Sequence, residues 1–274
     1  MSGSAPTSTS TTGTAFAAAR NERRATLVGY LPAGFPDVDG AIDAMRTLVD
    51  AGCDVIEVGL PYSDPVMDGP TIQAAAQQAL EAGTRTADVI RTVEAVAGTG
   101  VPTVVMTYWN PVVRYGVDRF ARDLANAGGA GLITPDLVPD EAEEWEAAAD
   151  AKGLDKIFLV APSSTDQRLA MTTGRCRGFV YATAVMGVTG ARESSSRLAG
   201  PLVSRVREVT DLPVGVGLGV SSGDQAAEVA AFADGVIVGS AFVRRLLDAG
   251  ADRAAGLASL AELATDLAEG VRRG

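Results

Sequence analysis

The residues best suited to chemistry in this sequence lie in the segment EVGLPYSDPVMDGPTIQ, which begins at Glu57. The apolar run before Glu57 is typical of a buried parallel strand, and Gly59 and Pro61 end it. A carboxylate there is costly to bury without a partner. It is therefore either paired with an arginine or backbone amides, or it acts as a general acid or base. Side chains alternate along a strand, so the small Gly59 shares a face with Glu57 and leaves room for a ligand.

What the sequence lacks narrows the chemistry further. There is no histidine, which excludes a Ser-His-Asp triad, a Cys-His pair and the usual zinc sites, so no metal site is predicted. The only lysines, Lys152 and Lys156, lie away from any glycine-rich loop, so a Schiff base has no good candidate. Carboxylates, tyrosine hydroxyls and backbone amides remain.

Composition bounds the class of protein. The chain has 274 residues, of which 47% are hydrophobic, and no apolar stretch long enough to span a bilayer, which indicates one large α/β domain without a membrane role. A net charge of -11 without a Lys/Arg block argues against nucleic-acid binding. Only two cysteines and no signal-peptide segment favour the cytoplasm. Residues 1–14 are rich in Ser and Thr and carry no charge, so we expect a disordered leader before a domain over 15–274.

The elements that must position these groups alternate regularly. Helical patterns follow each apolar run, with clear examples at 38–51, 118–127, 140–151 and 223–232, and a short helix at 16–24 precedes the first run. Eight such units in a chain of this length predict a (β/α)8 TIM barrel with extra helices. A doubly wound open sheet is the alternative, although no glycine-rich dinucleotide fingerprint follows the first strand. The eight predicted strands are 27–31, 55–60, 103–107, 131–134, 157–161, 178–182, 214–218 and 235–239.

A barrel would bring its strand ends together at one face and would place a phosphate site there. The segments 215–222 and 235–242 each end a strand and open a helix, and their glycines let amides approach an anion. A third glycine-rich piece is 187–190; the alternative is that these glycines only make turns. We interpret the loop 184–198 as a lid, with a plain surface loop as the alternative. Candidates at this face are Tyr30, Glu57, Asp64, Asp68, Tyr108, Asp136, Tyr181, Gly219 and Ser240.

The segment around Glu57 resembles the most diagnostic motif of tryptophan synthase alpha subunits. The resemblance continues through YLPAGFP, MTYWNPV, ITPDLVPDEA, FLVAPSST, FVYATAVMGVTGAR, GVGLGVSS and DGVIVGSAFV and covers about residues 26–247. It implies a TIM barrel that cleaves indole-3-glycerol phosphate to indole and glyceraldehyde 3-phosphate, a retro-aldol reaction in the last stage of tryptophan biosynthesis. No cofactor is implied in this chain.

The resemblance also implies catalytic roles. Glu57 would protonate the indole C3 carbon and accept the glycerol hydroxyl proton, Asp68 would hold the indole N–H, and Tyr181 would orient the substrate. Taken alone, Asp68 is better read as a helix cap or turn residue and Tyr181 as a core residue. Positions that match the indole pocket are Tyr30, Met106, Ile133, Leu159, Thr189 and Leu218; those that match the phosphate site are Gly190, Gly219, Gly239 and Ser240.

Two departures from the family are Tyr30, where several relatives have Phe, and Val185, where some have a basic residue. Membership implies a beta-subunit partner with pyridoxal phosphate in an alpha-beta-beta-alpha tetramer, facing the loops of Asp64, Asn110 and Asp136. Alternatives are a stand-alone lyase that releases free indole, a catalytically weak barrel that only activates the beta subunit, and an unrelated phosphosugar isomerase with a carboxylate base.

Overall fold

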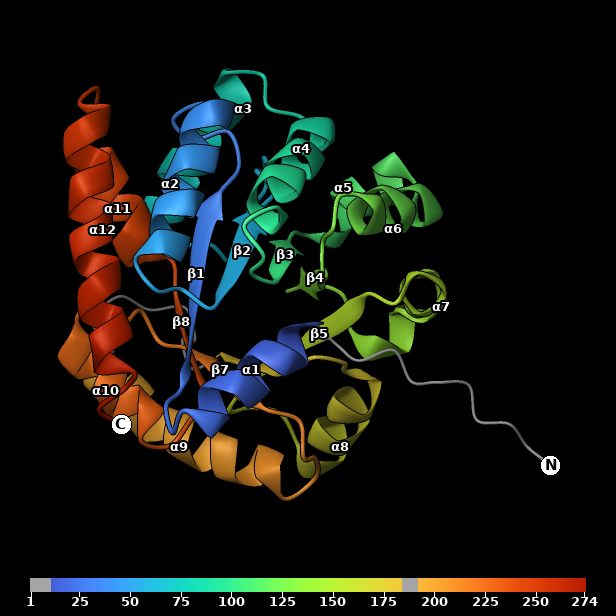
Figure 1. Cartoon of the computed structure of the whole chain (residues 1–274). Coiled ribbons are helices and arrows are strands. Elements are labelled where there is room, and N and C mark those ends of the chain that lie inside the picture. The colour runs from blue at the N-terminus through green and yellow to red at the C-terminus, as the bar shows by residue number, and fades with distance from the viewer. Residues whose placement is uncertain (1–10, 184–191) are drawn as a thin grey trace.

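The eight strands form a closed parallel barrel, as the sequence predicts (Figure 1). The computed structural model describes residues 11–183 and 192–274. Each strand pairs with the next along the chain, and β1 closes the barrel on β8. The strands are β1 (Thr26–Pro32), β2 (Val55–Gly59), β3 (Thr103–Met106), β4 (Gly131–Thr134), β5 (Asp155–Val160), β6 (Val180–Thr183), β7 (Val214–Gly217) and β8 (Gly235–Val238).

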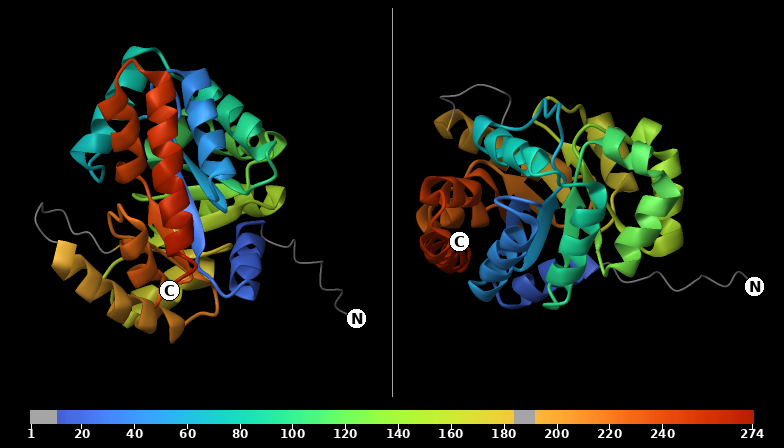
Figure 2. Two further views of the ribbon diagram at one scale, coloured as in Figure 1. Left: turned by 60° about the vertical axis from the view of Figure 1, so that its left-hand side comes forward. Right: turned by 90° about the horizontal axis from the view of Figure 1, so that it is seen from above.

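Helices surround the barrel. The last helix, α12, packs against α2, α10 and α11, so that the end of the chain lies beside one of its first helices (Figures 1 and 2). The helices are α1 (Thr11–Asn21), α2 (Val38–Asp50), α3 (Pro70–Glu81), α4 (Thr86–Ala97), α5 (Trp109–Tyr115), α6 (Val117–Asn126), the 3-10 turn η1 (Pro139–Glu141), α7 (Glu143–Lys152), α8 (Asp166–Arg175), α9 (Arg192–Arg207), α10 (Gly223–Ala230), α11 (Ser240–Ala249) and α12 (Arg253–Gly270).

Strand alternation divides the core into two layers. On β2, Ile56 and Val58 pack outward against the helices, whereas Val55 packs inside the barrel on the same face as Glu57. The barrel interior is filled by Val28, Val55, Val104, Ala130, Ile133, Ile157, Phe179 and Ile237, with Phe16 from α1.

Helix α1 closes the end of the barrel from which β1 starts (Figure 1). Its Phe16 stacks on Phe179 with ring centroids 5.0 Å apart. A Cβ at Gly235 would lie 2.7 Å from the Phe16 ring, so a glycine is needed there for the ring to enter. The Phe16 ring packs within the barrel interior, which makes α1 part of the barrel core.

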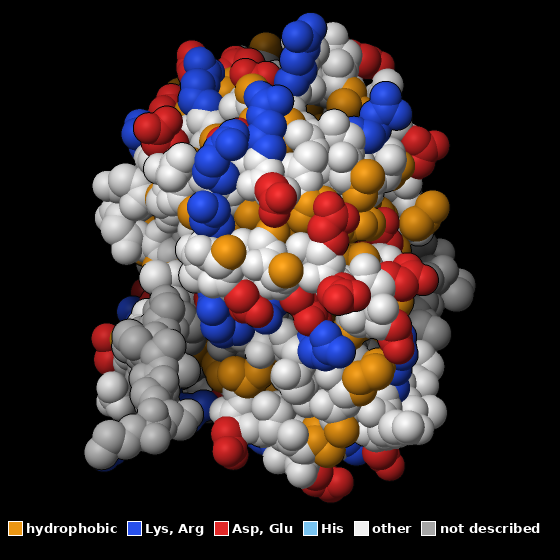
Figure 3. Space-filling model, turned by 90° about the vertical axis from the view of Figure 1, so that its right-hand side faces the viewer, with side chains coloured by type: hydrophobic (Ala, Val, Ile, Leu, Met, Phe, Trp, Pro, Cys, Tyr) orange, Lys and Arg blue, Asp and Glu red, His pale blue; other side chains and the backbone are white. Residues whose placement is uncertain are grey.

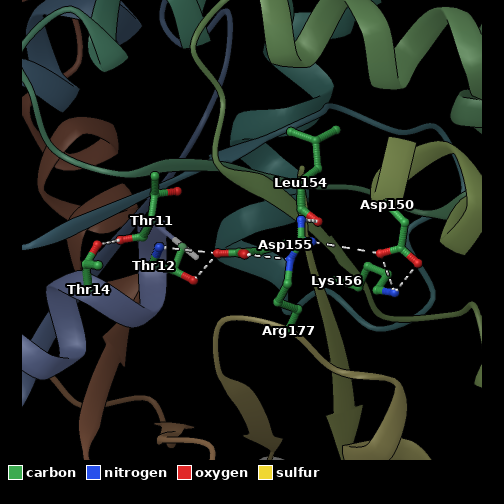
Figure 4. Close-up of polar contacts among 8 residues, drawn as sticks. All are labelled: Thr11, Thr12, Thr14, Asp150, Leu154, Asp155, Lys156 and Arg177. Carbon is green, nitrogen blue, oxygen red and sulfur yellow. Dashed lines mark hydrogen bonds and ion pairs between the residues drawn. The ribbon is translucent and has the colours of Figure 1, made fainter. Parts of the chain in front are cut away.

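A buried polar cluster fixes α1 to β5 (Figure 4). The Asp155 carboxylate, which is fully buried, accepts hydrogen bonds from the Thr12 amide at 3.2 Å and from the Thr12 hydroxyl. Arg177 pairs with its other oxygen at 3.3 Å. The Arg177 guanidinium also donates to the Leu154 carbonyl. The first turn of α1 is therefore tied to the start of a central strand.

Several expected boundaries need correction. Residues 11–14, which we expected to be disordered, form the first turn of α1, and Thr12 is buried; residues 1–10 lie outside the described residues. The helix predicted at 16–24 accordingly spans Thr11–Asn21. The predicted loop 184–198 is helical from Arg192 onward, while 184–191 lie outside the described residues. The helix predicted at 140–151 is interrupted at Ala142, where η1 gives way to α7.

On the side of the molecule where α5, α6 and α7 lie, acidic and basic side chains are interspersed, and hydrophobic side chains occur in small groups (Figure 3). Within residues 11–183 and 192–274, no helix has the length and apolar character needed to cross a bilayer.

Candidate active site at the carboxyl ends of the strands

A cavity of about 320 Å³ opens at the carboxyl ends of the strands. This is the face at which TIM barrels build their active sites. We call it the mouth cavity. Its lining comes from all eight strands or the segments after them and comprises Tyr30, Glu57, Met67, Asp68, Gly69, Ile72, Met106, Pro135, Leu159, Tyr181, Thr183, Gly217, Gly219, Ile237, Gly239 and Ser240.

Glu57 lies on β2 between Tyr30 of β1 and Val104 of β3. Its side chain is fully buried, and neither carboxylate oxygen has a hydrogen-bond partner among the described residues. Burial disfavours the charged form and raises the pKa of Glu57 to about 8. Within that part of the chain, the alternative that Glu57 is paired with an arginine or capped by amides is therefore wrong. At neutral pH this carboxyl group holds a proton that it can give away.

Asp68 lies in the loop between β2 and α3 and is less buried than Glu57. Burial raises its pKa to about 6, and a hydrogen bond with Tyr108 opposes that rise. Asp68 therefore carries its charge at neutral pH. The two carboxyl groups of the mouth cavity thus have pKa values on either side of 7, which suits one for giving a proton and the other for stabilising positive charge.

Tyr108 supports the Asp68 loop and received no role from the sequence. Its hydroxyl accepts a hydrogen bond from the Met67 amide at 2.8 Å, next to Asp68. Its ring packs against Tyr62 with centroids 5.2 Å apart. Its position just beyond β3 placed Tyr108 among the candidates at this face, but nothing in the sequence indicated that it supports the Asp68 loop.

Two tyrosines flank Glu57 inside the barrel. Burial raises the pKa of Tyr30 and of Tyr181 well above the usual value, and the nearby Asp68 and Glu57 raise both further. The Tyr30 ring occupies the space beside Gly59, where a Cβ would overlap the Tyr30 hydroxyl. The small neighbour of Glu57 therefore makes room for Tyr30 itself. Tyr181 leans over β7 in the same way, because a Cβ at Gly217 would lie 2.8 Å from its hydroxyl oxygen.

Gly219, Gly239 and Ser240, which follow β7 and β8, also line the mouth cavity. Ser240 begins α11, whose amino terminus has no side-chain cap from the described residues, so its first amides are available to an anion. Gly219 has a φ of +69°, a conformation that favours glycine, and no described atom lies within 4 Å of where its Cβ would be. In contrast, Ser222 caps α10 through the Gln225 amide. Of these two helix ends after β7 and β8, the uncapped one begins at a residue that lines the cavity.

Of the remaining residues predicted for the indole pocket, some line the mouth cavity and others do not. Met106 and Leu159 line the mouth cavity together with Tyr30. Ile133 does not line it, because it is fully buried one layer deeper in the barrel, and Leu218 does not because it packs on the outer core. Thr189 and Gly190 lie outside the described residues. Lining residues that the sequence did not single out include Met67, Ile72, Pro135, Thr183 and Ile237.

Metal or nucleophile chemistry finds no support in the described part of the chain. No group of three or more His, Cys, Asp or Glu side chains is placed there to hold a metal ion. Burial raises the pKa of Cys53 and raises that of Cys176 to about 12, so both thiols stay protonated.

Comparison with known proteins gives a consistent result. Residues 16–272 match the family model described as tryptophan synthase alpha chain. The tryptophan synthase alpha chain of Salinispora tropica is 66% identical over 260 residues, covering 95% of this chain and 97% of the relative. A tryptophan synthase structure from Mycobacterium tuberculosis is 58% identical, with a TM-score of 0.91, and covers 97% of this chain and all of the matched chain. The tryptophan synthase subunit alpha of Legionella pneumophila str. Paris is 30% identical with a TM-score of 0.86, covering 96% and 98%.

Proposed function

The chain belongs to the tryptophan synthase alpha chain family, and on that premise we propose which residues carry out its lyase reaction. The reaction is the retro-aldol cleavage of indole-3-glycerol phosphate to indole and glyceraldehyde 3-phosphate. The observation that carries the proposal is Glu57, a fully buried carboxyl group in a cavity at the barrel mouth that bonds to none of the described residues. No structural pairing with them accounts for its burial, whereas proton transfer does.

Glu57 is the acid and then the base. A retro-aldol step without a lysine imine needs an electron sink, and protonation of the indole C3 carbon makes one from the ring itself. Glu57, with a pKa of about 8, gives its proton to C3 at neutral pH. The carboxylate then takes the proton of the glycerol hydroxyl as the carbon–carbon bond breaks. The bonding electrons return to the ring, an aldehyde forms, and Glu57 is again protonated.

Asp68 and Tyr181 prepare the ring for that transfer. Asp68, with a pKa of about 6, is ionised at neutral pH and accepts the indole N–H, where positive charge develops after C3 is protonated. Tyr181 stands on β6, near enough to Glu57 for the carboxyl charge to raise its pKa, and orients the substrate. Tyr30, Met106 and Leu159 enclose the indole ring.

The phosphate group of the substrate binds where the segments after β7 and β8 line the mouth cavity. We assign it to the amides of Gly219, Gly239 and Ser240, supported by the uncapped amino terminus of α11. Gly190 and Thr189 complete the phosphate and indole contacts by family resemblance.

The partner of this chain is a tryptophan synthase beta subunit, and we propose that it docks on the loops after β2, β3 and β4. Asn110 donates to the Tyr62 hydroxyl at 3.2 Å, and the Trp109 amide donates to Asp136 at 2.9 Å, so these loops form one connected surface. It exposes large apolar side chains that a partner would cover. They are Val66, Met67, Val113 and Val138, with Asp64 beside them.

The assembly would be an alpha-beta-beta-alpha tetramer in which pyridoxal phosphate belongs to the beta subunit and this chain needs no cofactor. Its cysteines are free, which fits our proposal of a cytoplasmic location. Residues 1–10 stay assigned to a leader.

Indole release from indole-3-glycerol phosphate, measured with the purified chain alone and with a beta subunit added, tests the proposal. We expect slow release that rises sharply with the partner, together with a shift in elution volume. Fast release by the chain alone would instead identify a stand-alone lyase. No release in either case would overturn the catalytic assignment, and an unchanged rate and elution volume would overturn the partner.

A further inference from the structure

A second cavity adjoins the mouth cavity on the outer side of the phosphate loops. It measures about 370 Å³, and we call it the outer cavity. Gly219 and Ser240 line both cavities, so the proposed phosphate site forms the boundary between them. The outer cavity is lined further by Thr71 of α3, Ser221, Leu263 of α12, and Ala241, Arg244, Arg245 and Asp248 of α11.

The phosphate site formed by the amides of Gly219, Gly239 and Ser240 has too little positive charge for its proposed ligand. Amides at a helix end supply about half an elementary charge, whereas a phosphate ester at neutral pH carries nearly two negative charges. The chain as a whole has a net charge of -11, which repels such a ligand further. Among the described residues that line the two cavities, only Arg244 and Arg245 are basic.

Arg244 is the better placed of these two arginines. It follows Ser240 by four residues on α11, so both side chains lie on one face, about 6 Å apart along the axis. Side chains on a helix lean toward its amino terminus, which directs Arg244 back toward Ser240 and the phosphate loops. Arg245 is rotated by a further ~100° around the helix and bonds to Ser259 of α12 at 3.4 Å.

The hydrogen bond that Arg244 makes to Thr71 does not neutralise its positive charge, so the guanidinium can still attract an anion. Its guanidinium donates to the Thr71 hydroxyl, a neutral group, and no ion pair to a carboxylate of the described residues accompanies that bond. Thr71 is the second residue of α3, which begins directly after Asp68 and Gly69. The bond therefore holds the guanidinium between the Asp68 loop and the start of α11, beside the phosphate boundary.

We propose that Arg244 binds the substrate's phosphate as a cationic contact from the outer cavity, adding to the amides of Gly219, Gly239 and Ser240. Thr71 holds the guanidinium in position when the site is empty. The proposal rests on the phosphate site assigned above. It makes Arg244 a residue that selects for a phosphorylated substrate, while proton transfer at Glu57 does not depend on it.

The test compares Arg244→Gln with Arg245→Gln, which removes the same charge from the same cavity at a position turned away from Ser240. We expect Arg244→Gln to lower kcat/KM for indole-3-glycerol phosphate about tenfold, mainly through KM, with Arg245→Gln within about twofold of the parent chain. Arg244→Lys should recover part of the loss, because charge returns without the planar fork. Equal KM values in the two glutamine variants would overturn the proposal.

Binding of glycerol 3-phosphate, measured by calorimetry, tests the role of Arg244 separately from the phosphate site formed by the amides of Gly219, Gly239 and Ser240. We expect the parent chain and Arg245→Gln to bind it and Arg244→Gln to bind about tenfold more weakly. If the parent chain binds and Arg244→Gln binds equally well, the role of Arg244 is wrong and the amide site stands. If the parent chain does not bind at all, the amide site and the role of Arg244 both fail, whatever the cleavage assay gives.

Discussion

Glu57 and Asp155 are both fully buried carboxylic acids in one barrel, yet they have opposite surroundings. Asp155 stands at the start of β5, where the Thr12 amide and hydroxyl and the Arg177 guanidinium meet it (Figure 4). Glu57 stands near the end of β2, where neither oxygen has a partner within residues 11–183 and 192–274. A buried charge is tolerated when it is paired, and loss of its partner destabilises the fold, whereas an unpaired buried carboxyl group is costly to ionise, which is why the pKa of Glu57 is raised. The two ends of the barrel thus divide stability from function.

The substitution Glu57→Gln should give the largest effect on rate. Glutamine keeps the shape but cannot transfer a proton, so we expect kcat for indole release to fall by about 10³-fold or more. Release within tenfold of the parent chain would contradict the role of Glu57 as acid and base. The assay is indole formation by the complex with the beta subunit.

The same variant should be more stable than the parent chain at alkaline pH. The pKa of Glu57 is about 8 in the folded state, above the ordinary value of 4.5, so the folded state binds more protons between these pH values. Stability therefore falls as the pH rises from about 4.5 to 8, and Glu57→Gln escapes that loss. We expect a gain of ~5 kcal/mol at pH 9 that disappears near pH 4.5, measured by denaturant unfolding. A loss of stability at pH 9 would mean that Glu57 has a partner after all.

Asp155→Asn should lower the stability of the fold and leave the rate of indole release nearly unchanged, the reverse of Glu57→Gln. Removal of the charge weakens the bonds to Thr12 and Arg177 in a buried place, and we expect a loss of about 2–3 kcal/mol in the free energy of unfolding. Indole release at 25 °C should stay within about twofold, because the cluster lies at the other end of the barrel.

Asp150→Asn is the matched control. Asp150 is exposed and pairs with Lys156 at 2.7 Å and with Arg177 at 3.9 Å. Its loss should cost at most ~1 kcal/mol. Equal costs for the two asparagine variants would show that the burial of Asp155 does not matter.

The two acids also differ in how far the sequence could reveal them. Glu57 interrupts an apolar strand, and this local anomaly is visible in the sequence alone and indicates function there. Asp155 gives no such signal, because the predicted strand began at 157 and its partner Thr12 is 143 residues away in a segment expected to be disordered. Composition cannot report a contact that only the closed barrel creates.

At the mouth cavity, too, the sequence could predict only those features that do not depend on how the strands are arranged in the closed barrel. Eight runs with helices between them predicted the barrel, and the alternation of two placed Glu57 on the same strand face as Gly59. That alternation also directs Leu218 outward with Val216, which the match to family positions did not take into account. Ile133 does face inward, but how deep it lies depends on the tilt of the strands, which sequence spacing does not give.

The pH dependence of kcat/KM sharpens the comparison within the active site. The proposed mechanism needs Glu57 protonated and Asp68 ionised, and burial raises their pKa values to about 8 and about 6. We expect a bell-shaped profile with its maximum near pH 7 that falls about tenfold per unit beyond either limb. Asp68→Asn should remove the acid limb and leave the alkaline one. An acid limb that survives in that variant would assign it to another group.

Thr12→Val should give the smallest effect. Valine keeps the shape of threonine but removes the hydroxyl group that donates a hydrogen bond to Asp155. The contacts of Asp155 with the Thr12 amide and with Arg177 remain. We expect a loss of about 1 kcal/mol in the free energy of unfolding, and a kcat that does not change. Thr14→Val is the control, because the Thr14 hydroxyl is exposed and bonds to the Thr11 carbonyl at 2.6 Å within the same helix. If both variants lose the same stability, α1 is held by its own helical propensity and by Phe16. If only Thr12→Val loses stability, the long-range bond to Asp155 makes residues 11–14 part of the barrel.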